Sequence, residues 1–275
     1  MRKLPYLGLA VSLIGGPTAW AHDYWDLAST TDDGPVVVNE LVHGSSQQHD
    51  LETKAGPVAD EDWFFVVSFG SSSYEAVVDA TSGDLALSTS PGLERLDVTG
   101  TTVVQFAEKA NPGPTGNGAS VALRWQNTTP GTFGAAFEWL RVRSGVCGLT
   151  CGPEDQYRLR FFDTTIAVPR FNNSSGQVTM LIVQNTTSWI RPIAGTVYFW
   201  SAGQPIGMLL GSSTFNLAAN AALVLNTGTV PGVAGQAGTI TISHDGGYGN
   251  LAVKAVALEP STGFSFDSPG LYKPK

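Results

Sequence analysis

The segment DEDWFFVVSF (residues 60–69), the linker GSSS (70–73) and the segment YEAVVD (74–79) decide the fold. Both outer segments are rich in aromatic and β-branched residues, which favour β-strands. The linker of one Gly and three Ser is typical of a tight turn. We therefore predict two β-strands that pair as a hairpin from Trp63 to Asp79.

The rest of the chain repeats this pattern of strands and turns. In the run 156–162, Tyr157, Leu159 and Phe161 alternate with polar residues, which is the period of a sheet with one solvated face. Gly, Pro, Asn and Ser separate further strand-sized runs, and no run has a helical period long enough for an α/β fold. The composition of 32 Gly, 16 Pro and 14% charged residues agrees. The sequence therefore predicts an all-β protein of two β-sandwich domains.

The first residues have the features of a secretory signal peptide. Arg2 and Lys3 precede an apolar run from Leu4 to Gly15, and Ala19-Trp20-Ala21 is a small-x-small cleavage site. The apolar run is shorter than the ~20 residues of a spanning helix, so a membrane anchor is the less favoured alternative. We expect residues 1–21 to be removed and the mature chain to be secreted, extracellular or periplasmic, without a membrane span.

Charge is distributed unevenly along the mature chain. Residues 22–166 hold 20 Asp/Glu and 8 Lys/Arg, whereas residues 167–275 hold 3 and 5. This asymmetry predicts an acidic sandwich over 22–165, an Ig-like sandwich over 166–268 and a loose tail over 269–275. An acidic surface argues against nucleic acid as a partner, because a phosphate backbone requires a basic face. An acidic surface permits the binding of divalent cations, but it can also serve solubility alone.

Two cysteines lie in the segment CGLTC (147–151). In an exported protein, such a close pair in a Gly-containing loop predicts a disulfide between Cys147 and Cys151. A metal site would need further Cys or His ligands close by in the sequence, and a redox-active pair usually has two intervening residues. The expected role is local, with about 2 kcal/mol of chain-entropy stabilisation from so short a loop.

Residues 36–163 resemble the bacterial pre-peptidase C-terminal (PPC) domain family. The segments that carry the resemblance are 44–51, Asp60-Glu61-Asp62-Trp63-Phe64, 73–78, 82–85, Trp139-Leu140-Arg141-Val142 and 155–159. The resemblance implies a jelly-roll-like β-sandwich that binds, stabilises or presents rather than catalyses, and some members of the family bind calcium. No peptidase domain precedes the module in this chain, so the peptidase association does not carry over.

Asp60, Asp62 and Asp84 are the candidate metal ligands, with calcium as the cation and Asp79 as a further candidate. Carboxylates in a loop are hard oxygen ligands that suit calcium, but no complete calcium-binding loop is present. The alternative is that Asp62 caps the turn at the start of its strand, as Asp often does.

Two enzymatic interpretations were weighed against this one. Cleavage after Ala21 would expose an amine and an imidazole on His22, which could hold copper if His43, His49 or His244 supplied a second imidazole, yet no spacing supports such a partner. For hydrolysis, the chain has neither a Gly-x-Ser-x-Gly elbow nor a His-Glu-x-x-His site. A catalytic triad assembles in space, so these absences leave a hydrolase open.

Of the tryptophans, Trp189 lies in the polar segment TTSW (186–189) and is the candidate for an exposed ligand contact. Trp63, Trp139 and Trp200 lie inside strand patterns and are expected in the core. The sequence therefore predicts an exported, non-catalytic binding, adhesion or structural module, with an extracellular polysaccharide or a surface protein as partner. The alternative is a secreted hydrolase or a calcium- or copper-dependent enzyme.

Overall fold

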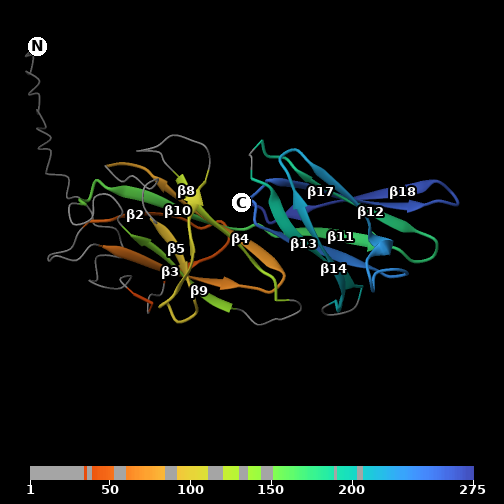
Figure 1. Cartoon of the computed structure of the whole chain (residues 1–275), viewed down its shortest axis with the longest axis horizontal. Helices are drawn as coiled ribbons and strands as arrows, with labels where there is room; N and C mark the ends of the chain where they lie inside the picture. Colours follow the sequence, from red (N-terminus) through yellow and green to blue (C-terminus); the bar gives the residue numbers. More distant parts are fainter. Residues whose placement is uncertain are drawn as a thin grey trace, which may run out of the picture.

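The computed structural model describes residues 34–35, 39–52, 60–83, 92–110, 120–129, 136–143, 151–188, 191–202 and 207–275 (Figure 1). Nearly all regular structure in these residues is β. The strands are β1 (Glu40–Leu41), β2 (Ser46–Asp50), β3 (Glu61–Ser68), β4 (Ser72–Ala80), β5 (Leu93–Leu96), β6 (Val103–Phe106), β7 (Glu108–Lys109), β8 (Ser120–Asn127), β9 (Ala136–Arg143), β10 (Gln156–Asp163), β11 (Ile166–Asn172), β12 (Val178–Asn185), β13 (Ile193–Ser201), β14 (Leu209–Leu217), β15 (Ala222–Asn226), β16 (Ala237–His244), β17 (Leu251–Glu259), β18 (Phe264–Pro269) and β19 (Leu271–Tyr272).

These strands form four sheets that pack in pairs. Sheet A has the order β1-β3-β9-β5-β6 and sheet B the order β2-β10-β4-β8-β7. Sheet C has the order β14-β13-β16-β11-β19 and sheet D the order β15-β12-β17-β18. One hydrophobic core lies between sheets A and B, and a second lies between sheets C and D. The predicted all-β sandwich architecture is confirmed.

The two sandwiches lie end to end along the long axis of the molecule (Figure 1). The chain changes sheet between β10 and β11, where Thr164 and Thr165 are the linking residues. Thr164 is fully buried, and its hydroxyl donates a hydrogen bond to Ser73 Oγ at 2.9 Å. The linker is therefore fastened to the start of β4. The described residues contain no helix of the length and apolarity that crossing a membrane would require.

The predicted hairpin over Trp63 to Asp79 is wrong in its pairing. β3 belongs to sheet A and β4 to sheet B, so the chain crosses from one sheet to the other at the GSSS linker. Phe64 and Val66 on β3 and Ala76 and Val78 on β4 fill the same core from opposite sides. Two hydrogen-bonded neighbours would present these residues side by side on one face, whereas an arch lets them face each other.

The turn itself supports the arch. Ser71 has φ 59°, and the backbone N–H of Phe69 donates to the hydroxyl of Tyr74 at 2.7 Å. A side-chain oxygen thus satisfies a backbone group that a hairpin would have paired with the neighbouring strand. A Gly/Ser linker favours a change of direction in either geometry, so the local sequence does not distinguish a hairpin from an arch.

The C-terminal residues are ordered, and the prediction of a loose tail over 269–275 is wrong. β19 pairs with β11, and the Gly270 N–H donates to the Val253 carbonyl at 2.8 Å. Beyond β19, the Lys273 ammonium forms an ion pair with Asp163 of β10. A short strand and one long-range ion pair fasten this segment, and neither leaves a local periodicity in the sequence.

Close packing of backbones in sheet C yields a test of the fold. A Cβ atom built on Gly238 of β16 would lie 1.7 Å from the carbonyl oxygen of Trp200 on β13. Rigid backbone cannot move aside as a flexible side chain can, so we expect Gly238→Ala to lower the free energy of unfolding by about 1–3 kcal/mol. Denaturant unfolding monitored by circular dichroism measures this loss. Gly34→Ala, which meets no atom within 4 Å, is the control, and equal stability of the two variants would contradict the packing described.

Candidate functional site

The residues predicted to bind calcium are only partly described. Asp60 and Asp62 are both buried, at 2% and 0% exposure, and Asp62 accepts a hydrogen bond from the Tyr157 hydroxyl. Asp84 lies outside the described residues. Within the described residues, no three His, Cys, Asp or Glu side chains gather as a metal site. The calcium set therefore remains a prediction, and Asp62 has a structural contact with the core tyrosine.

The three described histidines have separate surroundings. His43 accepts a hydrogen bond from the Asp163 N–H at 3.0 Å and donates to the Pro274 carbonyl at 2.9 Å. His49 is buried and stacks on Tyr157, with ring centroids 5.5 Å apart. His244 is fully buried in sheet C. His22, the partner that the copper hypothesis requires, lies outside the described residues.

The predicted disulfide and the predicted ligand contact also involve residues outside the described part of the chain. Cys151 is buried in the core of the first sandwich, whereas Cys147 lies outside the described residues, so the disulfide remains a prediction. Trp189, the predicted ligand contact, also lies outside them. Trp63 and Trp125 are buried, as the sequence predicted for Trp63, while Trp139 and Trp200 are half-buried.

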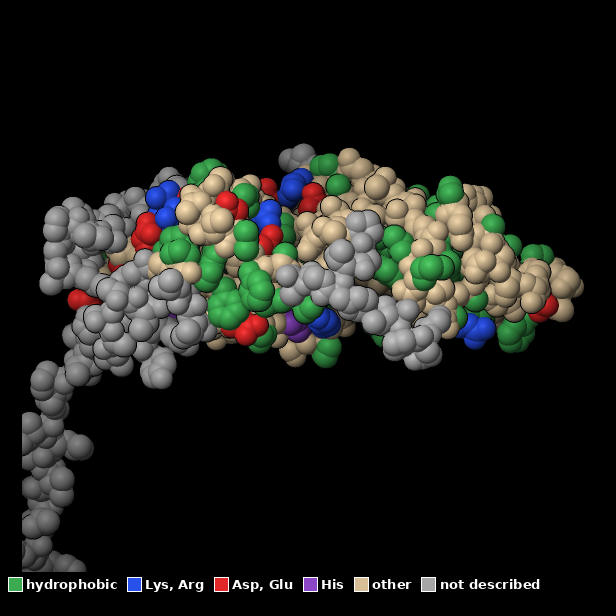
Figure 2. Space-filling view, turned by 90° about the horizontal axis from the view of Figure 1, so that it is seen from below, with side chains coloured by type: hydrophobic (Ala, Val, Ile, Leu, Met, Phe, Trp, Pro, Cys, Tyr) green, Lys and Arg blue, Asp and Glu red, His purple; other side chains and the backbone are tan. Residues whose placement is uncertain are grey.

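The outer face of sheet A carries exposed apolar side chains beside a charged cluster of Glu61, Glu94, Arg141 and Arg143. Every exposed large hydrophobic residue described in the first sandwich lies on a strand of sheet A or within two residues of one: Val42 (56% exposed), Phe69 (49%), Val98 (64%), Val104 (49%), Phe106 (59%) and Phe137 (52%). In the register of the sheet, Phe137 lies opposite Val67, and half-buried Trp139 lies opposite Phe65. Figure 2 shows hydrophobic side chains gathered on this side of the first sandwich, beside a histidine. Sheet B presents no such residue in its described part.

A cavity of about 260 Å³ opens at the edge of this face. Leu41, Tyr74 and Phe161, which are nearly fully buried, form its floor, and the exposed Val42 and Phe69 stand at its rim. His43, Glu40, Val67, Asp163 and Lys273 complete the lining. Its size is just below the usual range for small-molecule pockets and suits one large side chain.

The floor also carries a polar group. The Tyr74 hydroxyl accepts the N–H of Phe69 at 2.7 Å, and the Ser72 side chain is a second hydrogen-bond partner. Burial raises the pKa of Tyr74 to about 12, with the negative charge of Asp163 adding to the shift. The phenol therefore stays protonated at any physiological pH, at the floor of a cavity that both apolar and charged side chains line.

A charged network joins the two sandwiches. Arg124 of β8 donates to Glu75 of β4 at 2.8 Å, and both side chains are about nine-tenths buried. The second oxygen of Glu75 accepts the backbone N–H of Tyr248, in the loop after β16, at 2.9 Å. A Cβ on Gly247 would lie 2.7 Å from the Glu75 carboxylate, so the lack of a side chain at Gly247 lets the carboxylate approach the loop this closely.

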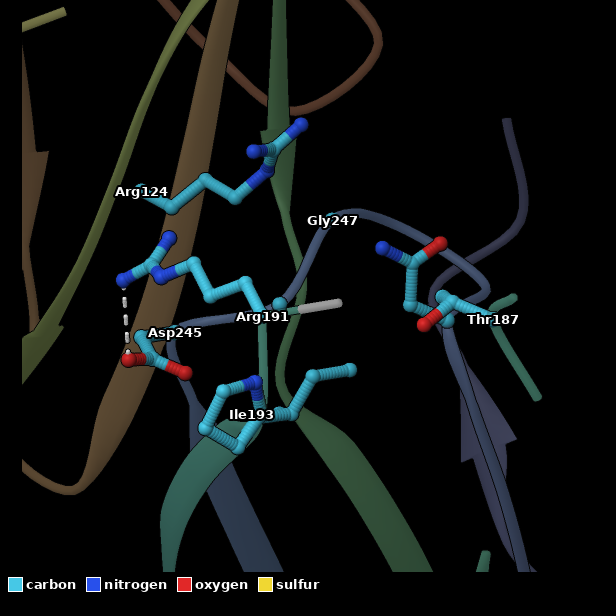
Figure 3. Close-up of a pocket in the computed structure, with 9 residues that line it drawn as sticks. Arg124, Thr187, Arg191, Ile193, Asp245 and Gly247 are labelled. Atoms are coloured by element: carbon cyan, nitrogen blue, oxygen red, sulfur yellow. Dashed lines mark hydrogen bonds and ion pairs between the residues drawn. The ribbon is translucent and has the colours of Figure 1, made fainter. Parts of the chain in front are cut away.

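Arg191 extends this network. It binds Glu108 of the first sandwich and, at 3.1 Å, Asp245 of the second, as the dashed line in Figure 3 marks. The space between these residues holds only about 30 Å³, room for about one water molecule. The network holds three carboxylates, of Glu75, Glu108 and Asp245, against two arginines, so its net charge is negative. A negative net charge disfavours an anion site, and we interpret the network as a structural junction.

His244 couples the junction to the linker. The Gly246 N–H donates to its Nδ1 at 3.1 Å, so the proton is on Nε2, which donates to the Thr164 carbonyl at 3.0 Å. Burial lowers the pKa of His244 to about 4, and the nearby Arg124 charge acts in the same direction. The imidazole is therefore neutral in the folded protein at neutral pH.

The C-terminal segment closes the junction on the side of the cavity. The Tyr248 hydroxyl donates to the Lys273 carbonyl, and the Lys275 ammonium lies 4.6 Å from the Tyr248 ring centroid and 4.8 Å from that of Phe162. Sequence reasoning missed this junction. The one local feature of the sequence at this place is the Gly pair after Asp245, which is typical of a turn and here also contacts Glu75.

Comparison with known proteins adds no identification. No family model matches the chain, and no curated protein sequence matches it significantly. The resemblance of residues 36–163 to the PPC family therefore remains a prediction.

Removing the Glu75 carboxylate tests the junction. Glu75→Ala leaves the Arg124 guanidinium nine-tenths buried without its closest partner, and we expect a loss of about 3 kcal/mol in the free energy of unfolding. Because Glu75 also holds Tyr248, the unfolding transitions of the two sandwiches should separate in calorimetry. Asp267→Ala, which breaks the half-exposed pair Lys254–Asp267, is the control and should change little. A single unshifted transition in Glu75→Ala would contradict this role.

The low pKa of His244 predicts that the folded protein loses stability as the pH is lowered. The pKa is about 4 in the folded state and about 6.5 when unfolded, so below pH 6.5 the unfolded chain binds a proton that the folded chain excludes. The contribution of neutral His244 to the free energy of unfolding is fully present above pH 6.5 and is lost as pH falls towards 4. The loss between pH 7 and pH 5 is about 2 kcal/mol. Denaturant unfolding at both pH values, compared with His244→Gln, measures this term. The same pH dependence in both proteins would show that His244 is not its source.

Proposed function

We propose that this chain is an exported, non-catalytic binding protein that docks an apolar segment of a partner protein on the outer face of sheet A. The observation that carries the proposal is the concentration of exposed Val and Phe side chains on that sheet, next to a cavity of side-chain size. Export rests on the leader-like residues 1–21. Contiguous apolar surface on a soluble domain is typical of a protein–protein site.

The charged side chains near this face favour a protein over a polysaccharide. Arg141 and Arg143 both bind the buried carboxylate of Glu94, at 2.9 and 2.6 Å, and the Arg141 guanidinium lies 5.2 Å from the Trp63 ring centroid. These contacts use the planar polar groups that would otherwise bind sugar hydroxyls. What the face offers is apolar area, which suits Leu, Phe or Met side chains of a partner.

The cavity residues favour binding over catalysis. Both nitrogens of His43 already make hydrogen bonds, and Asp163 holds Lys273 and the Thr165 N–H. A general base needs a free nitrogen or carboxylate within reach of substrate. We propose that the cavity instead receives one side chain of the partner, which packs on Leu41, Tyr74 and Phe161 at its floor.

Phe137→Asp tests the proposed face. A charge placed among apolar side chains that contact a partner should weaken binding roughly tenfold or more. Residues 22–275 would be immobilised and their binding measured against surface proteins extracted from the producing cells and against a panel of soluble polysaccharides. Phe264→Asp, which changes an exposed phenylalanine on the second sandwich, is the control.

Three results would overturn the proposal. These are equal losses in the two variants, protein binding unchanged by Phe137→Asp, or binding confined to polysaccharides. Thermal unfolding of each variant establishes that the fold is retained before binding is compared.

A further inference from the structure

The second sandwich contains a long region without charge. From Pro192 through His244 there is no Asp, Glu, Lys or Arg, although the chain as a whole is 14% charged. This region forms β13, β14, β15 and β16. Figure 2 shows the contrast on one face, where charged side chains are frequent over the first sandwich and sparse over the second. A surface without charge lacks the repulsion that keeps soluble proteins apart.

An edge strand lies in this region. β14 has nine residues and pairs only with β13 among the described strands, so its other side has no neighbouring strand. Its sequence, LLGSSTFNL, has neither charge nor proline. Exposed backbone N–H and C=O groups on such a strand are a template for another strand.

The other sheet edges of the described chain are short or carry protective residues. β1, β7 and β19 have two residues each, β6 has four, and β2 has five and ends in Asp50. β18 carries Asp267 and Pro269. β15 is also uncharged but has only five residues. β14 is thus the longest edge in the described part of the molecule and one without the usual protection against pairing.

We propose that β14 is the dimer interface of this protein and pairs antiparallel with β14 of a second copy. An uncharged strand meets its own copy without like charges opposite each other, and Ser and Thr side chains form favourable cross-strand pairs. The acidic residues of the chain, which would repel a second copy, lie almost entirely in the first sandwich. Two-fold pairing uses the same edge on both copies and closes the assembly, because neither β14 remains free.

The accessible part of the strand is its C-terminal half. The loop around Pro231 packs on Gly211, where a Cβ would lie 2.4 Å from the Pro231 carbonyl oxygen. Beyond it, Ser212, Thr214 and Asn216 are exposed, and Phe215 and Leu217 reach into the core. Pairing of Ser212–Leu217 with its copy would join two five-stranded sheets into one continuous sheet and place Thr214 and Asn216 beside the partner strand.

Sedimentation velocity of residues 22–275 over a hundredfold concentration range tests the proposal. The wild-type chain should approach twice the monomer mass as concentration rises. Thr214→Lys/Asn216→Lys, which places like charges side by side across the two-fold axis, should remain a monomer. A mixture of this variant with Thr214→Glu/Asn216→Glu should regain the dimer, because opposite charges then face each other.

Thr239→Lys/Ala252→Lys is the matched control. It adds the same charge at exposed positions of β16 and β17, which are interior strands, and should dimerise like the wild type. Amide hydrogen exchange over Ser212–Leu217 should slow in the dimer and not in the Lys variant.

A wild-type chain that is monomeric at every concentration would overturn the proposal. This holds even if the β14 edge binds a different protein. A dimer that persists in Thr214→Lys/Asn216→Lys would place the interface elsewhere. Equal dissociation of the control variant would assign the effect to net charge rather than to β14. None of these results bears on the apolar face of sheet A, so the two proposals fail independently.

Discussion

The Glu75 carboxylate is the interaction on which the arrangement of the two sandwiches depends. It is nearly buried, binds Arg124 within its own sheet and accepts the Tyr248 N–H from the second sandwich. A buried carboxylate is costly unless both oxygens have partners. The second partner is available because the loop after β16 lies against β4 and β8. The buried charge therefore stabilises the way in which the two sandwiches meet.

Around this contact, neighbouring groups make the junction specific. Neutral His244 connects the linker carbonyl of Thr164 to the same loop, and Arg191 bridges acids of both sandwiches. The C-terminal lysines bind the opposite side, at the cavity that borders the apolar face of sheet A. The proposed binding face is therefore shaped by both sandwiches, because Lys273 of the second one lines the cavity of the first.

The two surfaces proposed for interaction differ in chemistry. The outer face of sheet A offers exposed Val and Phe side chains, and its free energy of binding would come from apolar area. The β14 edge offers backbone hydrogen-bonding groups on an uncharged strand, and its specificity would come from strand pairing. They lie in different sandwiches, so a dimer formed through β14 would leave both apolar faces free for partners.

Much of the fold could be predicted from the sequence. The all-β class followed from alternating apolar residues, as in Tyr157, Leu159 and Phe161, and from frequent Gly and Pro, because a two-residue period is a local property of the chain. The strand pairing of 63–79 could not be predicted, since a Gly/Ser linker serves a hairpin or an arch. The choice depends on whether Phe64 and Val78 enter their common core from one sheet or from two. The junction between the sandwiches and the cavity beside it escaped prediction almost entirely. Glu75, Arg124, His244 and Lys273 are far apart in the sequence and have no shared motif, and their burial and pairing arise only when two sheets and two sandwiches pack together.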